Sequence, residues 1–266
     1  MLQCSGSPAC MTRHDRGSGR DRESGGAMSR IIPSRPWTTS KLDDCAGHGP
    51  GSGAELFLVE GDSAAAAVGR VRDACMQAVL PMQGKPLNTT RASRRKVVEH
   101  PFFGPLTEAL GTGLATDCEP RRSRYDRVLV LTDPDADGIH CGYLVLLFFH
   151  RWLRPLLDAG LVEVVRPPWG EVVIEGELLL AFSEPELAAL ATRARGGGGT
   201  VRRFRGLAAL DADLLRETCI DPTTRRTERV STADVAAMIE LIGAVQPGQR
   251  DADHAPARAG RPARPG

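Results

Sequence analysis

Three aspartates at alternate positions, Asp133, Asp135 and Asp137, directly follow the apolar run "RVLVL" in the stretch "TDPDADGIH". Carboxylates this close repel one another unless solvent, protonation or a cation relieves the repulsion. In an extended segment, the side chains of Asp133 and Asp135 leave the chain on the same side. Hard oxygen ligands presented in this way suit Mg²⁺, which keeps several waters and commonly takes only one or two protein carboxylates. We therefore predict a metal site here.

Two other interpretations of the aspartates explain less. "DPDADG" matches the first half of an EF-hand calcium loop, but that loop needs a bidentate Glu where this chain has Leu144, and "RVLVL" predicts a strand where the motif needs a helix. An exposed turn with Asp137 and Gly138 capping the next helix would account for Asp137 alone. It leaves Asp133 and Asp135 without a role.

A further carboxylate, Glu60, stands at the end of another short apolar run, "ELFLVE". In an open α/β sheet, ligands bind beyond the carboxyl ends of the strands. If the strands that end at Glu60 and Asp133 are neighbours, both acids face one crevice. The "EGDSA" turn itself is no nucleophile elbow, because Ala65 replaces the required glycine and no histidine is a persuasive partner for Ser63.

The elements that must position these acids alternate in type. Strands are predicted at 55–60, 77–82, 127–132 and 161–165, with helices after Gly61, over 104–115 and from Ile139 to Leu157. This alternation favours a parallel α/β sheet. The longest apolar run starts at Gly142 and is broken by His150, Arg151 and Arg154, well short of the roughly 20 residues that a membrane span needs. It is interpreted as a core helix.

Composition narrows the class of protein. The chain has 266 residues, 41% of them hydrophobic, which is enough for a core, and a net charge of +1, so a polyanion would have to bind at local basic clusters. Such clusters occur at 91–96, 121–127, 202–205 and 224–229. The seven cysteines include no C-x-x-C pair, which indicates free thiols. The N-terminus has no apolar signal region, and together with the free thiols this indicates a cytoplasmic location.

Both ends differ from the rest of the chain. Residues 1–36 are rich in Ser, Gly and Arg, and residues 246–266 in Pro, Ala and Arg, so both segments are predicted to be disordered, with Met28 a possible start. Four consecutive glycines, Gly196 to Gly199, predict a flexible loop inside the structured region.

A strand ending in Glu-Gly, followed later by a strand ending in D-x-D-x-D-G, resembles the Toprim domain of topoisomerases, bacterial primases and some nucleases. "KLDDCAGHGPGSGAELFLVEGDSA", "AVLPMQGKPLN", "VLTDPDADGIHCGYLVLLFFHRW", "LVEVVRPPWGEV" and "RFRGLAALDADLLRETCIDPTTRRTERV" are similar to successive segments of the B subunits of bacterial type IIA topoisomerases, DNA gyrase and topoisomerase IV. The resemblance runs from about residue 41 to 243. It implies a Rossmann-like Toprim domain over 41–165 and a small α+β tail region over 166–245.

The resemblance also implies roles for individual residues. The family's metal carboxylates fall on Glu60, Asp133 and Asp135, with Asp137 completing the acidic set, and its DNA-contacting residues fall on Lys85 and Asn88. Glu60 is also the expected catalytic residue, able to exchange a proton with a leaving 3′ oxygen. Mg²⁺ is the implied cofactor. The implied partners are double-stranded DNA, an A-type subunit that supplies the tyrosine and, as a further option, a separate ATPase-domain chain, with no membrane.

The departures from the family pattern leave three functions open. Ala65, Ala66 and Ala208 replace family glycines, and only about 40 residues precede the match, so we expect no ATP binding. Tyr125 and Tyr143 are expected to be structural. The chain would then be a cleavage half-site that needs an A-type subunit, a non-catalytic truncated paralogue that regulates or competes with gyrase, or a stand-alone nuclease using metal-activated water.

Overall fold

The computed structural model describes residues 41–245. The segments 1–36 and 246–266, for which disorder is predicted, and the alternative start at Met28 lie outside the described residues.

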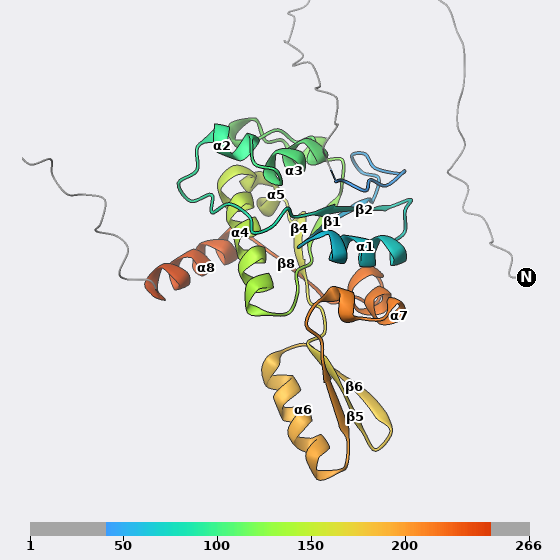
Figure 1. Cartoon of the computed structure of the whole chain (residues 1–266). Coiled ribbons are helices and arrows are strands. Elements are labelled where there is room, and N and C mark those ends of the chain that lie inside the picture. The colour runs from blue at the N-terminus through green and yellow to red at the C-terminus, as the bar shows by residue number, and fades with distance from the viewer. Residues whose placement is uncertain (1–40, 246–266) are drawn as a thin grey trace, which may run out of the picture. The chain divides into compact units, whose positions relative to one another are not determined.

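The chain has a mixed α/β fold (Figure 1). It is built on a five-stranded sheet of order β2-β1-β3-β4-β8. The strands are β1 (Glu55–Val59), β2 (Gln77–Pro81), β3 (Arg127–Val130), β4 (Val162–Val165) and β8 (Thr227–Arg229). The first four are parallel, and β8 adds to β4 in the antiparallel direction. The predicted α/β class with a parallel sheet is therefore confirmed. Every residue of β1 and β2 is buried, which is why each strand is apolar after its first residue, Glu55 or Gln77.

Alternate side chains of the strands enter two different cores. Leu56 and Leu58 of β1 pack in one hydrophobic cluster, and Phe57 and Val59 pack in another, because successive side chains of a strand point to opposite faces. The helices are α1 (Asp62–Val71), α2 (Arg94–Val98), α3 (Phe103–Leu110), α4 (Ala136–Trp152), α5 (Arg154–Asp158), α7 (Ala212–Leu215) and α8 (Thr232–Val245). Residues of α3 and α4 fill the first cluster, and residues of α1 fill the second.

Helix α4 is shorter than its sequence suggests. The prediction of one helix from Ile139 to Leu157 is wrong at both ends, since α4 begins at Ala136 and ends at Trp152, before the separate short helix α5. Pro155 lies in the first turn of α5, where its missing N–H is tolerated, whereas inside a continuous helix it would remove a hydrogen bond. The prediction of a core helix is confirmed, because most residues of α4 are buried and many of them belong to the first hydrophobic cluster. No helix within 41–245 is long and apolar enough to cross a membrane.

Two loop boundaries also differ from expectation. The helix predicted over 104–115 stops at Leu110, because Gly111 adopts a left-handed conformation (φ 70°) and its N–H donates to the carbonyl of Thr107. The loop expected at Gly196 to Gly199 is shorter, since helix α6 (Glu184–Gly196) includes the first of these glycines and a strand begins at Thr200.

The tail region contains a second, antiparallel sheet that sequence patterns did not reveal. Its strands β5 (Gly170–Ile174), β6 (Glu177–Ala181) and β7 (Thr200–Arg203) follow the order β6-β5-β7, and α6 (Glu184–Gly196) contributes to their small core. Glu175 and Gly176 form the β5–β6 turn with φ of 52° and 84°, the two-residue geometry that suits the twist of a hairpin. The tail region is thus α+β, and its last strand, β8, belongs to the five-stranded sheet.

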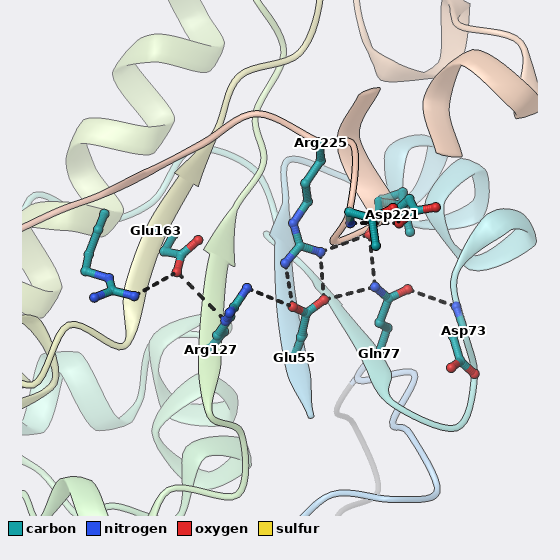
Figure 2. A network of polar contacts seen from close by, with 10 residues as sticks. Glu55, Asp73, Gln77, Arg127, Glu163, Asp221 and Arg225 are labelled. Atoms are coloured by element: carbon teal, nitrogen blue, oxygen red, sulfur yellow. Dashed lines mark hydrogen bonds and ion pairs between the residues drawn. The ribbon is translucent and has the colours of Figure 1, made fainter. Parts of the chain in front are cut away.

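A buried charge network joins the start of β1 to the tail (Figure 2). Arg225 donates two hydrogen bonds to Glu55, of 2.7 and 2.5 Å, and both residues are buried. Gln77 on β2 donates to Glu55 (2.9 Å) and to the carbonyl of Ile220 (3.0 Å), which also accepts from Arg225 (2.9 Å). The charges are therefore paired and well hydrogen-bonded, the condition under which ions are tolerated inside a protein.

We expect Arg225→Ala to lower the free energy of unfolding by about 3–5 kcal/mol, because it removes the buried guanidinium that is hydrogen-bonded to Glu55 and leaves only the half-exposed Arg127, 3.8 Å away, as a charged partner. Urea unfolding followed by circular dichroism measures the change. Arg229→Ala is the matched control, because Arg229 is exposed and lies 3.9 Å from Glu163, a distance at which an ion pair contributes little. Equal and small effects of the two substitutions would contradict this role for the network.

Candidate functional site

The pairing of β1 with β3 brings the predicted acids to one edge of the sheet. The two strands are parallel neighbours, with Leu58 opposite Val130, so their carboxyl ends coincide. Glu60 follows β1 and Asp133 follows β3, and the main-chain N–H of Asp133 donates to Oε1 of Glu60 at 2.7 Å. The expectation that the two strands are neighbours is confirmed.

Asp135 lies at the start of α4. Its Oδ1 accepts a hydrogen bond from the N–H of Gly138 at 2.8 Å, which makes Asp135 the N-cap of the helix. The alternative in which Asp137 provides the cap is wrong, because Asp137 lies inside the first turn. Its exposed carboxylate accepts from Nζ of Lys85 at 3.1 Å instead.

Asp133 is held from the tail region. Its Oδ1 accepts from the N–H of Leu207 at 2.9 Å, and Leu207 is itself buried in the hydrophobic cluster under α1. Gly206 packs so closely that a Cβ there would lie 2.6 Å from Oδ2 of Asp133. A Cβ at Gly138 would collide with the carbonyl of Asp133 and with Oε1 of Glu60. Glycine at these two positions therefore keeps room around the carboxylates.

Three carboxylates share the same mode of attachment. Glu60, Asp133 and Asp135 each have one oxygen fixed by a main-chain N–H. No hydrogen bond from a described residue reaches the second oxygen of any of the three. A hard cation binds such oxygens, so the donor chemistry fits the predicted Mg²⁺.

The electrostatics also favour a cation. Burial is the main cause that raises the pKa of Glu60 from 4.5 to about 7; the hydrogen bond from the N–H of Asp133 lowers it, and the charges of the three aspartates raise it further. Burial and the charge of Asp135 raise the pKa of Asp133. Ionised carboxylates are therefore destabilised here, and positive charge would relieve them.

The two residues predicted to contact DNA lie in the loop after β2. Lys85 is half exposed and reaches the acidic cluster through its ion pair with Asp137. Asn88 is exposed, and its side-chain oxygen accepts from the N–H of Thr90 at 3.0 Å. The structure therefore joins Lys85 to the acids, whereas no hydrogen bond between Asn88 and the acids occurs among the described residues.

Sequence reasoning missed Cys141. Ligand atoms of Glu60, Asp137 and Cys141 all lie within 4.8 Å of one another. Burial and the charges of Glu60 and Asp137 raise the pKa of the Cys141 thiol to about 11. The spacing from Asp137 to Cys141, four residues on one helix, is the signal that could have indicated the contact.

Tyr125 has a packing role in this structure. Its ring is fully buried and its hydroxyl donates to Asp44 at 2.6 Å. Burial and that hydrogen bond raise the pKa of Tyr125, so its phenolate is disfavoured. Tyr143, in α4, is partly buried, and burial raises its pKa as well.

An open α/β sheet with a glutamate after one parallel strand and aspartates after the next makes up the part of the chain that carries the site. Residues 55–167 match the family described as the Toprim domain, so the chain contains a Toprim domain.

Relatives of the chain include the B subunits of two topoisomerases, which confirms the resemblance. It is 34% identical over 202 residues to the DNA gyrase B subunit of Archaeoglobus fulgidus, covering 76% of this chain and 32% of that protein. It is 36% identical over 186 residues to the DNA topoisomerase 4 B subunit of Streptococcus pneumoniae, covering 68% of this chain and 29% of that protein. It is 35% identical over 230 residues to the DNA topoisomerase 4 B subunit of Pseudomonas aeruginosa, covering 85% of this chain and 36% of that protein. The chain spans about a third of the length of the curated relatives it matches.

The raised pKa of Glu60 generates a pH-dependent prediction. A carboxyl whose pKa is raised by folding stabilises the folded state below about pH 4.5, and that contribution is lost as the pH rises through about 7. With divalent cations chelated, Glu60→Gln should therefore raise the free energy of unfolding by about 1–2 kcal/mol near pH 8, after allowance for solvent screening, and change it little near pH 4.

Urea unfolding at the two pH values measures this difference. Glu217→Gln, which removes an exposed carboxylate outside the cluster, should show no such pH dependence. A Glu60→Gln protein that is less stable than the parent near pH 8 would contradict the electrostatic account.

Proposed function

We propose that this chain is the Mg²⁺-dependent DNA-binding and cleavage half-site of a type II topoisomerase, acting with an A-type subunit that supplies the tyrosine. The observation that carries the proposal is the convergence of Glu60 and Asp133 at the carboxyl edge of β1 and β3, with Asp135 at the start of α4. The relatives named as B subunits of DNA gyrase and of DNA topoisomerase 4 support it. A cytoplasmic location accords with this function.

In this proposal Glu60, Asp133 and Asp135 hold the cation through the oxygens that main-chain N–H groups leave free. When bound, Mg²⁺ stabilises negative charge on the scissile phosphate and on the leaving 3′ oxygen. Glu60, with a pKa of about 7, is able to take up or release a proton near neutral pH, and the bond between its Oε1 and the N–H of Asp133 keeps the carboxyl group in place.

Lys85 and Asn88 position the DNA strand without reading its sequence. Lys85 supplies a point charge for phosphate, and Asn88 supplies a neutral amide donor, because its oxygen is already engaged by Thr90. The exposed pair between Lys85 and Asp137 is weak in water, so phosphate is able to replace Asp137 as the partner of Lys85.

A non-catalytic regulatory paralogue is the second candidate. The observation that favours it is the presence of Ala65 and Ala66, where the family has glycines, in the first part of α1, the helix that begins two residues after Glu60; Ala66 is exposed. Such a chain would still bind an A-type subunit or DNA but would not support cleavage. A stand-alone nuclease, which needs no tyrosine, is the third outcome of the same experiment.

Incubation with supercoiled plasmid, with and without an A-type subunit, separates these functions. We expect Mg²⁺-dependent cleavage only with that partner, and its loss in Glu60→Ala. Glu217→Ala serves as a matched control for removal of a glutamate away from the site. Binding to the A-type partner without cleavage would replace the half-site by the regulatory paralogue, and nicking by the chain alone, lost in Asp133→Ala, would replace it by the nuclease.

Gly206 gives a test at the level of cation binding. Its backbone is extended (φ 172°), so an alanine there is not strained by its backbone conformation, and the added Cβ acts only through its contact with Asp133. We expect Gly206→Ala to weaken Mg²⁺ binding by about tenfold or more, as loss of a group that orients a metal ligand does. Calorimetric titration with Mg²⁺ measures the affinity.

Ala208→Ser is the control, because it makes a small change in the same turn of the tail, and it should leave the Mg²⁺ affinity unchanged. Unchanged Mg²⁺ affinity in Gly206→Ala would show that the space beside Asp133 is not needed for the cation, and would remove Asp133 from the proposed ligand set.

A further inference from the structure

Cys141 is a potential ligand that the proposed DNA cleavage does not use. It lies on α4, and only 5% of its surface is exposed. Its thiol has no hydrogen-bond partner among the described residues. The sulfur nevertheless lies beside two carboxylates, because Glu60 and Asp137 each place an oxygen within 4.8 Å of it. A buried thiol without a partner thus points into an anionic cluster.

The spacing of the three groups is close to that of ligands around a single ion. With Zn–S near 2.3 Å and Zn–O near 2.1 Å, two ligands of a tetrahedral zinc ion stand roughly 3.5 Å apart. The three ligand atoms lie within 4.8 Å of one another without any ion present, and the Asp137 side chain is 71% exposed and able to rotate inward. A modest contraction therefore completes three ligands, and water supplies the fourth, as in open zinc sites.

The donor set selects the kind of cation. Mg²⁺ takes oxygen ligands and gains nothing from a thiol, whereas Zn²⁺ and other thiophilic divalent ions bind thiolate, carboxylate and water together. We propose that Glu60, Asp137 and Cys141 form a second cation site that takes a thiophilic ion such as Zn²⁺. This site goes beyond the proposed function and does not require DNA cleavage for its existence.

Glu60 belongs both to the proposed Mg²⁺ site and to the second site, so the two sites affect each other. A zinc ion bound by Glu60, Asp137 and Cys141 withdraws Glu60 from the set proposed for Mg²⁺, so the two cations compete. Zinc must also displace Lys85 from Asp137. The side chain of Lys85 is 50% exposed and that of Asp137 is 71% exposed, so loss of this ion pair costs little free energy. The cluster would therefore respond to thiophilic metal by losing its Mg²⁺ site.

Spectroscopy with Co²⁺ tests the site directly, because thiolate bound to cobalt gives a charge-transfer band in the near ultraviolet. We expect the band in the parent chain and its removal by added Zn²⁺. Cys141→Ser should abolish the band and lower Zn²⁺ affinity by more than the roughly 10- to 100-fold that loss of an outer-shell partner causes. Cys75→Ser, which changes an exposed cysteine elsewhere, should keep both properties.

Asp137→Asn provides a second variant at an exposed position, where folding is not at risk, and should lower Zn²⁺ affinity while leaving the fold intact by circular dichroism. The proposal is overturned if the parent chain gives no charge-transfer band, or if the band survives in Cys141→Ser. Competition is read from the rise in apparent Kd for Co²⁺ when Mg²⁺ is added. Because these readouts involve no DNA, failure of plasmid cleavage would leave the zinc site standing, and failure of cobalt binding would leave the cleavage proposal standing.

Discussion

The parallel pairing of β1 with β3 is the constraint on which the site depends. Its register places Glu60 and Asp133 at the same edge of the sheet, where the N–H of Asp133 fixes one oxygen of Glu60. Main-chain donors fix Asp133 and Asp135 in the same way. Backbone groups cannot rotate away as side chains do, so the sheet and the start of α4 hold the carboxylates close together despite their repulsion. The oxygens that accept no hydrogen bond from the main chain stay available to a cation.

The tail region acts on the Toprim sheet at both ends of its strands. At the start of β1, Arg225 neutralises the buried Glu55, and at the carboxyl edge Leu207 donates to Asp133. The strand β8 extends the same sheet beyond β4. The sheet and the tail are therefore joined by contacts at both ends of the strands, and a change in the tail is expected to reach the site through these contacts.

Much of this arrangement could be predicted because buried parallel strands read as continuous apolar runs, and because acids after two such runs must meet if the strands are neighbours. Contacts between distant segments could not be predicted from the sequence. Leu207 is separated from Asp133 by 74 residues, and it donates through its backbone, which leaves no trace in residue type. The β5–β7 sheet was missed because its strands are short and half exposed. Cys141 was missed because its four-residue spacing from Asp137 indicates a contact only once both residues are placed on one helix, and the predicted helix began after Asp137.

The most direct measurement of the central claim is anomalous diffraction from crystals containing Mn²⁺, which takes oxygen ligands like those of Mg²⁺. The account predicts a manganese peak in contact with the carboxylate oxygens of Glu60, Asp133 and Asp135 at the carboxyl edge of β1 and β3. A peak that contacts neither Glu60 nor Asp133, or no peak at this edge with Mn²⁺ in excess, would contradict the account.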